Sequence, residues 1–139
     1  SLVNCFKALR LIDANFNRTK EGLRVCEDIV RFLYDERSLT HSFKKLRHEC
    51  SEILLDFPVP YRSLVEARQS GRDVGKKSFI SGKRKPNFQD LLIRNLKRAE
   101  ESLRVLEEVS QVIAPKTGRR FQALRFRLYG LEKRVLKKL

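Results

Sequence analysis

An internal repeat is the feature of this 139-residue chain that most limits its fold. Residues 15–30 (NFNRTKEGLRVCEDIV) align with residues 95–110 (NLKRAEESLRVLEEVS), 80 positions further along, and seven of the sixteen positions are identical. Both segments carry apolar residues at intervals of three and four, which predicts helices. The segments that follow match as well, residues 43–47 (FKKLR) with residues 121–125 (FQALR). The chain therefore contains two diverged copies of a helical hairpin.

The same periodicity predicts four main helices. Two lie in the first half, at about residues 2–34 and 39–55, and a third is expected at residues 88–113. This third helix should stop at Ala114-Pro115, because proline lacks an amide donor. The fourth is then expected to start after Thr117-Gly118 and to run to the C-terminus.

Each hairpin has one apolar side to bury, which decides how the halves combine. Two hairpins packed face to face about a pseudo-twofold axis form an antiparallel four-helix bundle, so we predict an all-α fold. The chain is long enough for one domain, residues 1–139, with repeat 1 at about 2–55 and repeat 2 at about 88–139. The connection, residues 56–87, is rich in proline, glycine and basic residues and has room for a short helix near residues 61–68.

The charge of the chain indicates what it attracts. Lysine and arginine number 31 against 17 acidic residues, so the surface should attract nucleotides, phosphorylated metabolites or nucleic acid. No apolar run is long enough for a membrane span or a signal peptide. The three widely spaced cysteines, Cys5, Cys26 and Cys50, fit reduced thiols and no zinc site. We expect a cytoplasmic protein that does not bind membranes.

Two asparagines and four arginines interrupt the apolar sides of the helices when side chains are placed at about 100° per residue. A buried arginine without a partner costs several kcal/mol, so each needs a carboxylate, a group of carbonyls or a bound anion. For the set we favour an anion pocket, because guanidinium groups suit bidentate contacts with phosphate. The inward-facing residues are Asn15, Arg18, Arg47, Asn95, Arg98 and Arg125.

A purely structural alternative stays open for each arginine. Glu21, Glu49, Asp90 or Glu101 could pair with them as buried ionic struts. Other polar residues fall outside the apolar arc of the first helix and are expected to face solvent. They are Asp13, Asn17, Lys20, Arg24, Glu27 and Arg31.

Two further pairs are weaker candidates. Gly22 and Ser102 occupy equivalent positions, where a small side chain admits either a ligand or a closely packed helix. Asp73 and Gly75 lie in the connection, where they form an ordinary turn or place a carboxylate that binds Mg²⁺ or an amine. The chain has no glycine-rich phosphate loop, dinucleotide fingerprint, kinase motif set or paired Cys/His finger.

Several motifs together resemble a known family over nearly the whole chain. They resemble the small helical domain often fused to thiamine-phosphate synthase, a hydroxymethylpyrimidine phosphate kinase. The motifs are residues 10–18 (RLIDANFNR), 21–25 (EGLRV), 27–28 (ED), 46–49 (LRHE), 72–75 (RDVG), 95 (N), 98–108 (RAEESLRVLEE) and 124–133 (LRFRLYGLEK). The resemblance implies a kinase that uses ATP to convert hydroxymethylpyrimidine monophosphate to the diphosphate in thiamine biosynthesis, on a fold unrelated to ribokinase-like enzymes.

What the resemblance implies agrees with an anion pocket. The acceptor phosphate is largely dianionic at neutral pH, so the difficulty is joining two polyanions rather than removing a proton. On this hypothesis the four arginines hold phosphates, Asn15 and Asn95 orient the pyrimidine or the ribose, and Asp73, Glu21 or Glu101 binds Mg²⁺. The pseudo-symmetry suggests one half of the bundle for each substrate without saying which.

Two alternatives from other classes remain. A non-catalytic helical module would bind nucleic acid or a partner protein through the basic surface; nucleic acid is the less expected partner, and its binding would depend steeply on salt. A sensor of a thiamine precursor would share the pocket but release no ADP. A homodimer and a thiamine-phosphate synthase partner or fusion are also open.

Overall fold

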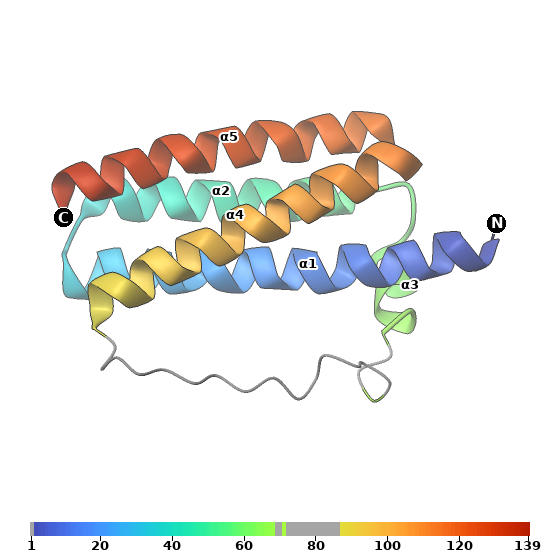
Figure 1. Ribbon diagram of the computed structural model, residues 1–139, viewed down its shortest axis with the longest axis horizontal. Helices are drawn as coiled ribbons and strands as arrows, with labels where there is room; N and C mark the ends of the chain where they lie inside the picture. The colour runs from blue at the N-terminus through green and yellow to red at the C-terminus, as the bar shows by residue number, and fades with distance from the viewer. Residues whose placement is uncertain (1, 69–70, 72–86) are drawn as a thin grey trace.

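The computed structural model describes residues 2–68, 71 and 87–139, with side chains from residue 6 onward. Four long helices form an antiparallel bundle (Figure 1), which confirms the all-α prediction. A short helix, α3, packs against the first long helix. The elements are α1 (Leu2–Asp28), a π-helical turn η1 (Ile29–Leu33), α2 (Arg37–Leu55), α3 (Tyr61–Glu66), α4 (Phe88–Ile113) and α5 (Pro115–Lys138).

The two hairpins, α1 with α2 and α4 with α5, pack as the repeat predicts. Helix α1 lies against α4, and α2 lies against α5, so the four helices close a ring around one core. Phe43 of α2 and Phe121 of α5, which occupy equivalent repeat positions, are both fully buried. No helix in the described ranges is long and apolar enough to cross a membrane.

Two helix boundaries differ from the prediction. Helix α5 begins at Pro115 rather than after Gly118, because proline is tolerated at the first helical position, where no intrahelical amide bond is needed. The first helix ends in the π-helical turn η1, which the apolar spacing does not predict. The turn ends at Leu33. Two residues later Asp35 has a φ of 50°, in the left-handed region, and the Glu36 amide donates to the Val30 carbonyl at 2.9 Å.

Two of the three cysteines lie in the described core. Cys26 and Cys50 are buried free thiols, as predicted. Burial raises the pKa of the Cys50 thiol to about 12, which keeps it protonated and unreactive near neutral pH. Both residues therefore contribute to the packing of the core.

Gly118 provides a test of the tight turn between α4 and α5. A Cβ atom there would lie 2.8 Å from the backbone nitrogen of Gln111 and 2.6 Å from its Cγ. We expect Gly118→Ala to lower the free energy of unfolding by about 1–3 kcal/mol in urea denaturation followed by circular dichroism. Gly130→Ala is the matched control, because a Cβ there meets nothing within 4 Å, and it should leave stability unchanged or raise it by up to about 1 kcal/mol. Equal effects of the two substitutions would contradict the packing at Gly118.

Candidate functional site

A pocket of about 590 Å³ opens between α1 and α4. Its ten lining residues form five pairs separated by 80 positions in sequence, so the pocket has the pseudo-twofold symmetry of the repeat itself. Four of the five pairs are identical residues. The pairs are Asn15/Asn95, Arg18/Arg98, Glu21/Glu101, Gly22/Ser102 and Val25/Val105.

The two asparagines are buried, as predicted, and they are held alike. Asn15 and Asn95 are only 4% and 3% exposed. Each amide nitrogen donates to the carbonyl four residues earlier in its helix, Leu11 and Leu91 respectively, at 2.9 Å in both cases. These matched hydrogen bonds fix the orientation of both amides and leave their Oδ1 atoms to accept from another group. Asn15 Oδ1 accepts from Arg18 at 3.4 Å.

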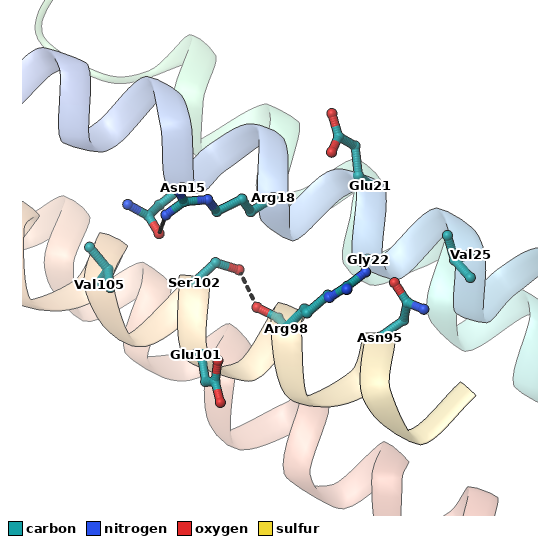
Figure 2. Close-up of a pocket in the computed structure, with 10 residues that line it drawn as sticks. All are labelled: Asn15, Arg18, Glu21, Gly22, Val25, Asn95, Arg98, Glu101, Ser102 and Val105. Carbon is teal, nitrogen blue, oxygen red and sulfur yellow. Dashed lines mark hydrogen bonds between the residues drawn. The ribbon is translucent and has the colours of Figure 1, made fainter. Parts of the chain in front are cut away.

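The first pair of arginines lines the pocket but is not buried, which corrects the prediction. Arg18 and Arg98 are exposed, and Figure 2 shows their side chains in the space between the two helices. Small residues occupy the positions where α1 and α4 come closest. Arg18 and Arg98 lie at the edge of the apolar arc, so their long side chains extend along the pocket. Neither guanidinium pairs with a carboxylate in the described part of the chain. Both are available to an anion from solvent.

Small side chains let the two helices approach closely beneath the pocket. A Cβ on Gly22 would lie 3.0 Å from the Asn95 carbonyl oxygen, so close helix packing accounts for this glycine. At the equivalent point Ser102 Oγ lies 2.6 Å from Thr19 Oγ1, in a buried hydrogen bond across the seam. Thr19 was not predicted at this site, because the alignment pairs it with Ala99 and it has no polar equivalent in repeat 2.

The second pair of arginines does not reach this pocket, contrary to the expectation of one site with four arginines. Arg125 is 6% exposed, and its Nε donates to Glu107 at 2.6 Å. Arg47 donates to both carboxylate oxygens of Glu27 at 3.4 Å. The two ion pairs join the helices of each hairpin at equivalent repeat positions. Arg47 and Arg125 are therefore structural ion-pair partners, which was the alternative to an anion pocket.

The partner carboxylates are not those considered from sequence. Glu27 and Glu107 are each 3% exposed, although Glu27 was expected to face solvent. Asp13 is also buried and accepts two hydrogen bonds from Arg68 of the segment after α3, at 2.7 and 2.9 Å. Both predictions were wrong because the neighbouring α2 and the segment after α3 cover a side of α1 that an isolated helix would expose. Arg24 is exposed, as predicted, and pairs with Glu27 at 3.0 Å.

Two carboxylates on the pocket could serve a metal ion only together with a ligand. Glu21 and Glu101 are exposed, one on each helix, and Figure 2 shows them at opposite edges of the pocket. Within the described ranges no group of three or more acidic, histidine or cysteine side chains could hold a metal. Mg²⁺ commonly takes one or two carboxylates plus phosphate and water oxygens, so these residues suit Mg²⁺ that arrives with a phosphate. Asp73 and Gly75 lie outside the described residues.

Two neighbouring glutamates, Glu100 of α4 and Glu132 of α5, lie between these two helices. Glu100 is buried, its Oε2 has no hydrogen-bond partner among the described residues, and Lys97 bridges its other oxygen to Glu132. Burial, and then the neighbouring Glu132, raises the pKa of Glu100 to about 7. Glu100 therefore loses its proton near neutral pH in the folded protein but near pH 4.5 in the unfolded chain.

The raised pKa makes stability depend on pH with a definite sign. Between about pH 4.5 and 7 the folded state holds a proton on Glu100 that the unfolded chain has lost. The free energy of unfolding therefore falls as pH rises through this range, and the contribution of Glu100 is lost above about pH 7. Glu100→Gln should remove this decline and exceed the unmodified protein in unfolding free energy at pH 8 by about 1 kcal/mol. Urea denaturation at several values between pH 5 and pH 8 measures the difference. Parallel pH profiles for the two proteins would contradict the assignment.

A basic cleft of about 390 Å³ lies between α2 and α5, on the opposite side of the bundle. His41, Lys45, Arg127 and Arg134 contribute to it. Arg134 donates to two serine hydroxyls at 2.8 and 2.9 Å, and Arg127 pairs with a glutamate. Two of its cations are thus already held by neighbouring side chains. The cleft lacks the matched pairs of the α1–α4 pocket.

Fold and pocket together define a class of protein: a pseudo-symmetric helical bundle with paired arginine and asparagine side chains in a pocket where its two repeats meet. The model of the ThiD2 family matches residues 10–134, and the chain belongs to that family. No solved structure matches the chain.

Similar proteins occur in cyanobacteria and are longer than this chain. A Synechocystis protein named thiamine-phosphate synthase is 37% identical over 128 residues, which cover 91% of this chain and 36% of the relative. Proteins with the same name from Nostoc and Synechococcus are 34% and 35% identical, again over 91% of this chain. The chain spans about a third of the length of these relatives.

Proposed function

We propose that this chain is a kinase of thiamine biosynthesis that transfers the terminal phosphoryl group of ATP to hydroxymethylpyrimidine monophosphate. The family and the name of its cyanobacterial relatives support the pathway. Because the chain matches only about a third of those relatives, we assign to it the kinase step and to the rest of the longer proteins the activity in their name. The synthase would then be a fusion partner or a functional partner of this chain.

The paired lining of the α1–α4 pocket is the observation that carries the proposal. A phosphoryl transfer between two phosphate-bearing substrates needs two anion-binding positions that face a common point. Arg18 and Arg98 supply one guanidinium on each side, and Asn15 and Asn95 supply one oriented amide on each side. A pocket of about 590 Å³ is within the usual size range for small-molecule sites.

The chain's own residues would act by positioning and by charge. The acceptor is already a largely dianionic nucleophile, so no general base is needed. Arg18 and Arg98 would hold the two phosphate groups and offset their repulsion, while the buried asparagines orient the attached rings. Bound Mg²⁺ would neutralise charge on the transferred phosphoryl group, with Glu21 or Glu101 as its protein ligand, directly or through water.

The direct test is turnover by the unmodified protein. The chain is incubated with ATP, Mg²⁺ and hydroxymethylpyrimidine monophosphate, and the diphosphate is followed by ³¹P NMR alongside ADP release. We expect one diphosphate for each ADP. Tight binding of the monophosphate without ADP release would instead support the sensor, and absence of both would overturn the proposed use of the pocket.

The basic α2–α5 cleft favours one alternative, a module that binds nucleic acid. Such binding would weaken steeply as salt rises and would survive substitution of Arg18 and Arg98, which lie on the other face. The loss of turnover in those variants, with no measurable DNA or RNA binding, would exclude this alternative.

A further inference from the structure

The two halves of the pocket differ in the charged residues next to their lining. Arg94 lies four residues, about 6 Å along the helix, before Arg98, so the two guanidinium groups project from the same face of α4. The equivalent residue of α1, four before Arg18, is Ala14. Arg94 and Ala14 are both exposed. Arg94 does not line the pocket, but it places a second cation on α4 one turn from Arg98, where α1 has none.

Other cations near the pocket do not restore the balance. Lys97 is held by Glu100 and Glu132 at 3.3 and 3.1 Å. Lys20 lies over the Phe16 ring at 5.4 Å and is close enough to lower the pKa of Cys50, so it faces α2. Arg10 lies eight residues, about 12 Å, before Arg18, which is twice the spacing of Arg94 and Arg98.

The arginines of the two halves also differ in their hydrogen bonds. Arg18 donates to Asn15 Oδ1 at 3.4 Å, so part of its donor capacity is used within its own half. Arg94 and Arg98 donate to no side chain in the described ranges. Two adjacent free guanidinium groups on α4 suit a polyphosphate, and a single guanidinium on α1 suits a monophosphate.

We propose that Asn95 and Arg98 of the α4 half of the pocket, with Arg94 just beyond its lining, bind the polyphosphate of the nucleotide, and that Asn15 and Arg18 of the α1 half bind the acceptor monophosphate. The assignment rests on the proposed function and adds Arg94 as a residue that determines which half takes the nucleotide. The two phosphate groups then meet above Gly22 and Ser102, the pair that lies between the two Asn–Arg pairs in Figure 2.

Isothermal titration calorimetry with two separate probes tests the assignment. MgADP reports the nucleotide half without reaction, and hydroxymethylpyrimidine monophosphate reports the acceptor half. We expect Arg94→Ala to weaken MgADP about tenfold and to leave monophosphate affinity within about twofold. Arg18→Ala should do the reverse. Steady-state kinetics of Arg94→Ala should show a raised KM for ATP with an unchanged KM for the acceptor.

Arg104→Ala is the matched control, because Arg104 is an exposed arginine of α4 that pairs with Glu108 outside the pocket, and it should change neither affinity. The assignment is overturned if Arg94→Ala weakens both ligands equally, weakens only the monophosphate, or weakens neither. If the unmodified protein forms the diphosphate while any of these patterns holds, the assignment of the two halves is wrong but the proposed kinase function is retained. If the unmodified protein binds neither ligand, both fail.

Discussion

Alanine in place of Arg18 or Arg98 should lower the rate of diphosphate formation at least about 100-fold, because each substitution removes a guanidinium from one side of the transfer. Both side chains are exposed and pair with no carboxylate in the described ranges, so neither substitution opens a cavity or strands a buried charge. The variants should therefore keep the helical circular dichroism spectrum and unfolding midpoint of the unmodified protein. Initial rates of ADP release at saturating substrates measure the effect.

Two controls separate a role in binding from a general loss of charge. Arg104→Ala removes the same charge from the outer face of α4 and should retain full activity. Arg18→Lys and Arg98→Lys retain the charge but lose the bidentate geometry, so they should fall between the unmodified protein and the alanine variants. Full activity of both folded alanine variants would contradict the pocket as the site of transfer.

Glu107→Ala should be the most destabilising of the substitutions considered, with a loss of about 3–5 kcal/mol in the free energy of unfolding. The substitution leaves the guanidinium of Arg125, which is 6% exposed, without its carboxylate. Tyr129 is its other hydrogen-bond partner, at 3.3 Å, and a neutral hydroxyl cannot balance the charge. Urea denaturation followed by circular dichroism gives the difference directly.

The first hairpin supplies the matched comparison. Arg47, the equivalent residue, has a side chain that is 16% exposed, and its contacts with Glu27 are longer, at 3.4 Å. Glu27→Ala should therefore cost less than Glu107→Ala, because Arg47 can recover hydration. The double substitution Glu107→Leu/Arg125→Met should restore much of the stability lost in Glu107→Ala. A cost below about 1 kcal/mol for Glu107→Ala would contradict a buried, charged strut.

The repeat made the fold and most of the pocket predictable. Two copies of one hairpin have few ways to bury their apolar sides, and the bundle follows from that alone. Asn15, Arg18 and their equivalents were identified because polar side chains interrupted an apolar arc, and all four line the pocket. A twofold axis through the pocket brings both copies of these residues to its lining, with Asn15 and Asn95 toward opposite ends (Figure 2).

The burial of individual side chains was harder to predict. Angles around an isolated helix do not include the crossing of α1 and α4, which leaves Arg18 and Arg98 at the open edge of the seam. These angles also ignore α2, the second helix packed against α1. Glu27 was therefore expected in solvent, although α2 covers it. One clue was present in the sequence: a glutamate at the same position of both repeats, with an arginine in both following helices.

A crystal structure of the chain with a non-hydrolysable ATP analogue, Mg²⁺ and hydroxymethylpyrimidine monophosphate tests the central claim most directly. We expect both ligands in the α1–α4 pocket, their phosphates contacted by Arg18 on one side and Arg98 on the other, and the transferred phosphoryl group above Gly22 and Ser102. Ligands bound in the α2–α5 cleft, with the α1–α4 pocket occupied only by water, would contradict it.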